Sequence, residues 1–172
     1  MRLPQAEVDR LLSPWLEVIA PRHAAGELAR DDPDYWAARA AADFARPDGH
    51  RDRGIVSIYL LKLVHLPPGA GLALGAGVLH AYLSGQVVEI MASSDNVLRG
   101  GLTPKHVDVP ELLDVLDFRP GRPEPITART VSPVECDYPV PADEFVLARL
   151  DLAPGASLVR RPLEGPDSFL VL

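Results

Sequence analysis

The sequence predicts an α+β chain that is mainly β, in which a helical N-terminal segment is followed by short antiparallel strands. Apolar side chains recur at helical spacing near the N-terminus, whereas short apolar runs bounded by Gly, Pro or Ser follow Ile55. The chain also contains 18 prolines and 13 glycines, which suits strands joined by tight turns better than a helical bundle.

Two helices are expected in the N-terminal segment. The apolar positions that predict the first are Val8, Leu11, Leu12, Trp15 and Leu16. Pro14 falls inside this pattern and predicts a kink or a split, because proline removes a helical hydrogen bond. The second helix is expected to begin with Asp32 as its N-cap and Pro33 in its first turn, and to end near Phe44.

Short strands are expected after the helices. Residues 58–66 are rich in β-branched and aliphatic side chains, and Pro67-Pro68-Gly69 closes this run as a turn. Further strands are expected at 72–74, 78–83, 87–91, 144–152 and 168–172. One short helix is expected at 110–118, and the proline-rich stretch 119–125 is typical of a linker.

These elements divide the chain into three parts. We expect a helical segment at 1–53, sandwich or barrel strands with a short helix at 54–118, and a linker with the start of a second, truncated β region at 119–172. The last predicted strand stops at its most apolar point, which suggests a sheet cut in the middle.

Composition argues against several classes of partner. The net charge is −7 and the arginines are scattered among acids, so nucleic acid is a poor partner. No apolar run approaches the roughly 18–20 residues of a membrane span, and the N-terminus has no apolar signal core. The single cysteine, Cys136, suits a reducing compartment, so we expect a cytoplasmic location.

One predicted hairpin combines two residues able to do chemistry. If Ser84-Gly85 is a two-residue turn, strands 78–83 and 86–91 pair so that His80 lies opposite Glu89, with Cβ atoms about 4.5–5.5 Å apart. One face is then mixed and could line a pocket, while the other is wholly apolar. The pair is either a structural cross-strand contact or a metal ligand beside a carboxylate that tunes it, and spacing leaves both open.

The residues around this hairpin resemble a known signature. They run His80-Ala81-Tyr82-Leu83-Ser84-Gly85, Glu89-Ile90-Met91-Ala92, Ser94-Asp95-Asn96, Arg99 and Gly101-Leu102-Thr103-Pro104-Lys105. This pattern resembles the active-site segment of type I phosphomannose isomerases. Weaker similarity reaches upstream through Asp52 and Gly54. Ile90 stands where Cys is common in the family, and Gly100 where Ala is common.

The resemblance implies a cupin-type jelly roll, here incomplete, with a helical insertion. It implies interconversion of mannose 6-phosphate and fructose 6-phosphate through an enediol, with one Zn²⁺ as cofactor. The family holds the metal with a Gln-x-His pair, a Glu and a second His, and only the last maps here, onto His80. We therefore expect the C-terminal portion of such an enzyme, inactive alone, with the missing N-terminal part as a partner.

The resemblance also implies roles for five further residues. Arg99 stabilises enediolate charge or clamps the substrate, unless it is a surface ion-pair residue. Glu89 acts beside the metal or in proton transfer, unless it only pairs with His80. Asp95 is a proton relay or a loop cap. Tyr82 bonds a sugar hydroxyl or only packs, and Lys105 binds the phosphate or a sugar oxygen, or is a solvated lysine.

Three rival readings stay open at this point. The chief one is a non-catalytic cupin module that binds a sugar phosphate. A metal-dependent cupin oxygenase is a weaker rival, because 77–80 offers one His where such sites draw on a His-x-His pair. The third is a subunit that another polypeptide completes. The isomerase reading places the chain in mannose and GDP-mannose metabolism.

Overall fold

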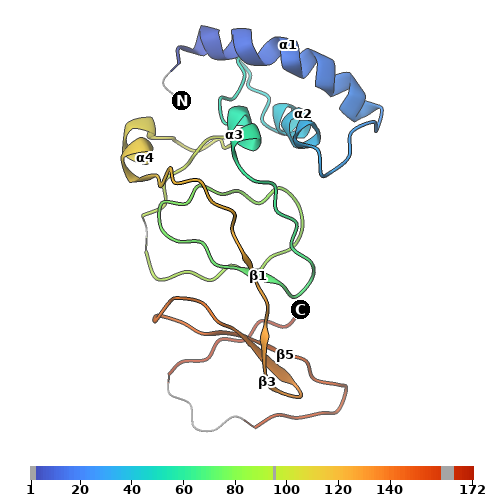
Figure 1. The fold of residues 1–172 in the computed structure, drawn as a ribbon, viewed down its shortest axis with the longest axis vertical. Helices are drawn as coiled ribbons and strands as arrows, with labels where there is room; N and C mark the ends of the chain where they lie inside the picture. The colour runs from blue at the N-terminus through green and yellow to red at the C-terminus, as the bar shows by residue number, and fades with distance from the viewer. Residues whose placement is uncertain (1–2, 95, 160–164) are drawn as a thin grey trace.

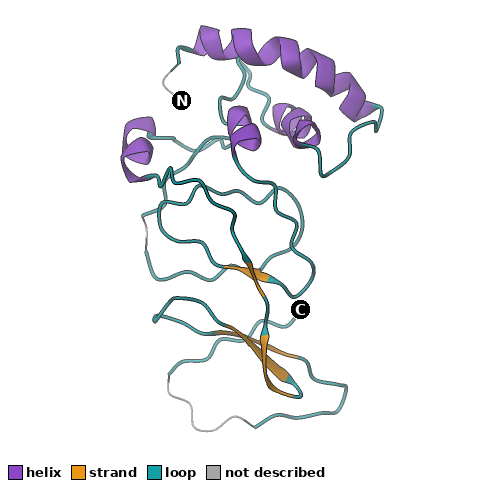
Figure 2. Cartoon of the chain, in the orientation of Figure 1, coloured by secondary structure: helices purple, strands orange, loops and turns teal. Residues whose placement is uncertain are grey.

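The computed structural model of the chain describes residues 3–94, 96–159 and 165–172. Helices gather at one end and two small antiparallel sheets lie toward the other, with long loops between them (Figures 1 and 2). The elements are α1 (Gln5–Ala24), α2 (Pro33–Asp43), α3 (Ile55–Leu60), β1 (Gly71–Leu72), α4 (Val109–Val115), β2 (Pro125–Ile126), β3 (Arg129–Ser132), β4 (Glu135–Tyr138) and β5 (Leu147–Leu150). None of the described helices is long and apolar enough to span a bilayer.

Helix α1 is one element that runs through both of its internal prolines, so the predicted split at Pro14 is wrong. Its buried residues are Val8, Leu12, Leu16 and Ile19. Tertiary packing of such a face supplies most of the stability of a helix in a protein, which lets α1 continue across a missing hydrogen bond.

Helix α2 confirms the predicted start. The side chain of Asp32 accepts a hydrogen bond from the backbone N–H of Asp34 at 2.9 Å, and Pro33 occupies the first turn. The helix ends at Asp43, next to the predicted end. Ala37 and Ile19 are both fully buried where α2 packs on α1, since a small side chain on one helix lets the other approach closely.

Helix α3 lies where the sequence predicted the beginning of a strand, and the strand prediction for 58–66 is wrong. Ile55 is 1% exposed and Ile58 packs against the same core, so burial of these two side chains on one helical face overrides β propensity. Asp52 Oδ1 accepts a hydrogen bond from Gly54 N at 2.7 Å and so shapes the turn that begins the helix.

Asp9 is one of the α1 side chains that hold the chain before α3. Asp9 accepts a hydrogen bond from Arg51 N at 2.8 Å, and its other oxygen lies 2.6 Å from His50 Nδ1. The hydrogen bond from Arg51 is the main reason that the pKa of Asp9 lies below its ordinary value. Gln5 also donates to Asp9, at 3.0 Å. This contact fixes residues 50–54 on the helical core.

The two sheets are small and antiparallel. Strand β1 pairs with β2, with Gly71 opposite Ile126, and β4 lies between β3 and β5. Tyr138 OH donates to Gly69 O at 2.8 Å and so links the three-stranded sheet to the turn before β1. The turn at 67–69 is confirmed, since Ala70 N donates to Pro67 O at 3.0 Å.

Several predicted strands are shorter or absent. The strand expected at 144–152 narrows to β5, the one expected at 72–74 becomes β1, and 168–172 forms no strand. Val171 and Leu172 are 93% and 96% exposed, so no neighbouring sheet covers the described C-terminal residues. The described strands form no closed barrel. The cupin jelly roll therefore stays a prediction.

Helix α4 confirms the short helix expected at 110–118 but is shorter. Asp108 accepts a hydrogen bond from Glu111 N at 3.0 Å, which caps the helix, and Leu112 is 3% exposed. The helix ends at Val115 instead of 118. Asp117 N then donates to Gly77 O at 2.9 Å, which draws the chain back beside the loop that leads into 78–91.

The helical core predicts a large effect of cavity formation. Ile19→Ala should lower the free energy of unfolding by about 2–5 kcal/mol, because a fully buried side chain is lost. Val18→Ala is the matched control: Val18 is 54% exposed on the same helix and should cost less than about 0.5 kcal/mol. Denaturant unfolding measures both, and equal losses would contradict the described core.

Candidate functional site

The predicted hairpin does not form a β ladder. Residues 78–91 carry no strand, although a bend occurs at the predicted turn, Ser84-Gly85. A lone two-stranded hairpin is marginal in water, and it needs a third strand or a packed face. Here Val88 and Ile90, from the face predicted to be apolar, are 49% and 42% exposed. In the described part of the chain no third strand pairs with these residues, so the two segments stay as extended loop.

Three of the predicted site residues nevertheless lie together. Tyr82 OH donates a hydrogen bond to Glu89 Oε1 at 2.9 Å. The rings of His80 and Tyr82 meet edge to face, with centroids 6.0 Å apart and planes inclined by 68°. The side chains therefore run in the order His80, Tyr82, Glu89. The direct contact to Glu89 comes from Tyr82, not from His80 as the two-residue register predicted.

The hydrogen bond of His80 fixes the state of its ring. Nδ1 lies 2.9 Å from Val78 O, and a carbonyl can only accept, so Nδ1 carries the proton. In the neutral ring Nε2 is then the unprotonated nitrogen, able to bind a metal or accept a proton. Metal-binding histidines commonly donate their second ring N–H to a backbone carbonyl in this way.

Partial desolvation and the neighbouring carboxylate both act on Tyr82, although the residue is 59% exposed. Partial desolvation is the first reason that the pKa of the Tyr82 phenol lies above its ordinary value of 10.0, and the hydrogen bond to Glu89 is the second. The phenol is therefore a stable donor near neutral pH. It orients one oxygen of Glu89 while leaving the other free.

Arg99 and Lys105 lie on the chain that follows, both exposed. Within the described residues, no hydrogen bond or ion pair joins either cation to His80, Tyr82 or Glu89. Lys105 N donates to Thr103 Oγ1 at 3.2 Å, which shapes the turn before its side chain. Asp95 lies outside the described residues.

A contact that the motif did not predict holds the two halves of this segment together. A Cβ built on Gly100 would lie only 2.7 Å from Leu79 Cδ1, so the Leu79 side chain packs on the backbone directly after Arg99. Leu79 is itself the neighbour of His80. The only sequence signal was the pair Gly100-Gly101, since adjacent glycines often mark a close approach of two backbones.

The described residues do not form a metal centre by themselves. They contain no group of three or more His, Cys, Asp or Glu side chains placed to hold an ion. Catalytic zinc usually takes about three protein ligands. His80 fits one ligand position because Nδ1 is satisfied by Val78 O, which leaves Nε2 as the ligand atom of the neutral ring. Cys136 is half-buried in β4 and has no part in this cluster.

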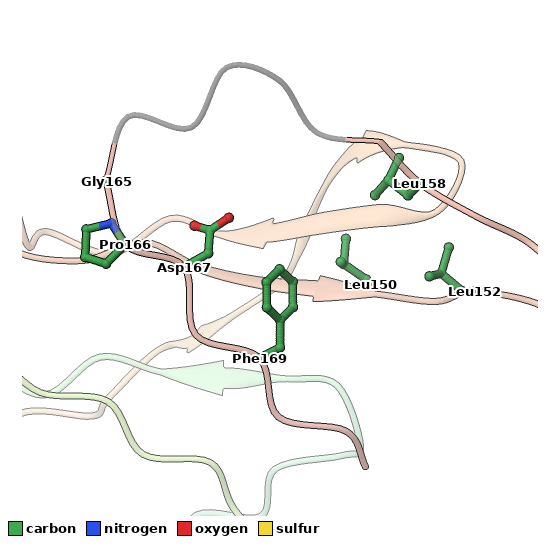
Figure 3. Close-up of a pocket in the computed structure, with 7 residues that line it drawn as sticks. All are labelled: Leu150, Leu152, Leu158, Gly165, Pro166, Asp167 and Phe169. Carbon is green, nitrogen blue, oxygen red and sulfur yellow. The ribbon is translucent and has the colours of Figure 1, made fainter.

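The described surface also has an open hollow of about 590 Å³ beside β5, which Figure 3 shows. Its described lining residues are Leu150, Leu152, Leu158, Gly165, Pro166, Asp167 and Phe169. They include none of the predicted site residues and no cationic side chain. A sugar phosphate would find no cationic partner among these described lining residues.

Comparison with known proteins shows what the chain is similar to. The chain is 43% identical to mannose-6-phosphate isomerase 2 of Arabidopsis thaliana over 121 residues, which is 70% of this chain and 27% of that protein. It is 48% identical to the mannose-6-phosphate isomerase of Salmonella typhimurium over 103 residues, 59% of this chain and 26% of that protein. The chain is related to mannose-6-phosphate isomerases.

The rat mannose-6-phosphate isomerase is 42% identical over 109 residues, so the similarity extends across plants, bacteria and mammals. No protein-family model and no solved structure matches the chain. The chain spans about a quarter of the length of the isomerases it matches. The resemblance read from residues 80–105 is thereby confirmed at the level of the family.

The Tyr82–Glu89 contact predicts a measurable titration effect. Glu89→Gln keeps an oxygen acceptor but removes the negative charge, so the pKa of Tyr82 should fall toward its ordinary value. Desolvation should keep it from falling the whole way. The measurement is an alkaline NMR titration of tyrosine labelled at the ring carbon that bears the hydroxyl.

The control for this titration is Glu124→Gln, an exposed acid in the loop before β2. It should leave Tyr82 unchanged. An unchanged Tyr82 pKa in Glu89→Gln would mean that the two side chains do not meet in solution.

Proposed function

We propose that this chain supplies part of the active site of a zinc-dependent isomerase that interconverts mannose 6-phosphate and fructose 6-phosphate. The observation that carries the proposal is the His80–Tyr82–Glu89 cluster, formed within a segment that matches mannose-6-phosphate isomerases. The names of the relatives state the reaction class. The chain covers about a quarter of their length, so the activity belongs to the longer enzyme.

The chemistry asks for three things. A base must take a proton from one sugar carbon and return it to the next, a second group must move the hydroxyl proton, and positive charge must face the developing oxyanion. Glu89 can accept a proton, and the Tyr82 hydroxyl fixes the direction in which one of its oxygens points. Tyr82 and Glu89 therefore form the proton-handling part of the proposed site.

Arg99 is the proposed source of positive charge. It is permanently cationic at physiological pH, and the described residues hold no carboxylate paired with it. A guanidinium that is not paired with a carboxylate can donate all of its N–H hydrogen bonds to the substrate. Lys105 is proposed to meet the phosphate as a point charge, and Asp95 to take part in proton relay. Either Glu89 or Asp95 would be the base that takes the proton from the sugar carbon.

Zinc enters this proposal as a cofactor that polarises or positions the sugar oxygens when bound. His80 is the one ligand that the described residues offer. The remaining ligands, and the cover that excludes water from the site, would come from the rest of the enzyme. The same reasoning makes that remaining polypeptide the chief partner of this chain.

We also infer a cupin-type jelly roll for the assembled enzyme and a cytoplasmic location. The antiparallel pairing of β1 with β2 and of β3, β4 and β5 supports the first inference, because a jelly roll is built from antiparallel strands. The single cysteine supports the second.

Substitution of Arg99 tests the proposed reaction. In the full-length enzyme, Arg99→Ala should lower kcat for mannose 6-phosphate by about 10²–10³-fold, as the loss of one donor to an oxyanion does. A coupled assay of fructose 6-phosphate formation measures the rate. Arg119→Ala is the matched control, since Arg119 is an exposed arginine paired with Asp117. Full activity of Arg99→Ala would overturn the assigned role, and an inactive unsubstituted enzyme would overturn the function.

Zinc binding tests the proposed division of ligands. The 172-residue chain alone should show no stoichiometric, tight binding in a calorimetric zinc titration, because it offers one of the usual three or more ligands. In the full-length enzyme, His80→Ala should weaken zinc binding, whereas His106→Ala should not. Tight one-to-one binding by the chain alone would contradict the proposal.

A further inference from the structure

The chain that follows Arg99 has an unusual backbone. Gly101 has φ +117° and Leu102 has φ +50°. A residue other than glycine in this left-handed region is uncommon and persists only where the surroundings fix it. Leu102 packs against the helical core that contains Ile55. The segment is therefore held in a strained form against α3.

What holds it is a direct contact between two backbones. A Cβ built on Gly54 would lie 2.9 Å from Leu102 N and 3.1 Å from Gly101 C. A Cβ built on Gly101 would lie 2.9 Å from Gly54 Cα. One side-chain atom, Asp52 Oδ1, would also lie 2.9 Å from the Cβ on Gly54 and 3.3 Å from the Cβ on Gly101, but the other atoms are backbone atoms that cannot swing away. Any side chain at either glycine must push the two segments apart.

The Gly54 side of the contact is rigid. Asp52 Oδ1 accepts from Gly54 N at 2.7 Å, and Ile55 N donates to Asp52 O at 3.2 Å. Gly54 and Ile55 are both buried. The same stretch is fastened to α1 by the hydrogen bond from Arg51 to Asp9. Gly101 thus contacts a buried stretch that hydrogen bonds hold to α1.

The Gly101 side leads directly to the proposed site. Gly101 is two residues from Arg99. The side chain of Leu79, the residue before His80, packs on Gly100 between them. A displacement at Gly101 would therefore move Arg99 relative to His80. A misplacement of about 1 Å can cost on the order of 10²-fold in rate.

We propose that Gly54, Gly101 and Asp52 are positioning residues that set the place of Arg99 relative to His80. They touch no reacting atom and act through the backbone of 100–102. This inference rests on the proposed isomerase function and adds to it a role for the turn that begins α3, which supplies Asp52 and Gly54.

The test is a pair of matched glycine variants in the full-length enzyme. Gly54→Ala should lower kcat for mannose 6-phosphate by about 10-fold to 10²-fold while KM changes much less, because charge placement matters most in the transition state. Gly75→Ala is the control: a Cβ there meets nothing within 4 Å, and its backbone is not in the left-handed region. It should keep full activity.

A double-variant cycle separates positioning from a general loss of structure. If Gly54 acts through Arg99, adding Gly54→Ala to Arg99→Ala should change kcat by less than about two-fold, since the group it positions is already gone. If the two losses multiply, or if Gly54→Ala keeps full activity, the positioning role is overturned.

Asp52→Ala adds no atoms and carries the same test if Gly54→Ala does not fold. It should lower kcat by a smaller factor and should also lose its effect in the Arg99→Ala background. Multiplying losses, or an Asp52→Ala enzyme as active as the unsubstituted one, would overturn the role. An unsubstituted enzyme without isomerase activity overturns the proposed function itself, which distinguishes the two failures.

Discussion

Burial of apolar side chains between α1, α2 and the first turn of α3 is the constraint on which the rest of the described structure depends. Nine of the buried hydrophobic residues form this one cluster. Contacts that attach other parts of the chain to it include the hydrogen bonds of Asp9 and Gln5 to Arg51, and the packing of Leu102 on the cluster itself. The loops that carry the proposed site are therefore held by packing against the helices and not by a local β-sheet.

The helical part could be read from the sequence because its signals are local. Asp32 with Pro33 caps α2 as predicted, since a cap needs only the next few residues. The strand prediction for 58–66 was wrong for the opposite reason. Ile55 and Ile58 pack on a buried surface made by distant residues, and this packing outweighs β propensity. The prediction of strands at 78–91 was wrong because a hairpin needs a third strand or a packed face, and the sequence of one segment does not show whether either is present.

The candidate site shows the same division. The family motif placed Tyr82, Glu89 and Arg99 in one segment, and comparison with known isomerases confirmed the family. It did not show that Tyr82 rather than His80 would reach Glu89, because that depends on a ladder that does not form. Nor did it reveal the contacts of Gly54 and Leu79. These contacts join residues far apart in the sequence, and their only sequence signal is a glycine.

The close approach of Gly54 and Gly101 also limits how this enzyme family can be recombined. Two stretches separated by more than forty positions share one steric requirement, which is the absence of a Cβ at both glycines. A chimaera that exchanged the helical segment with that of a relative would have to keep glycine at both 54 and 101. A crossover placed between the two positions preserves the contact only if each parent supplies its glycine.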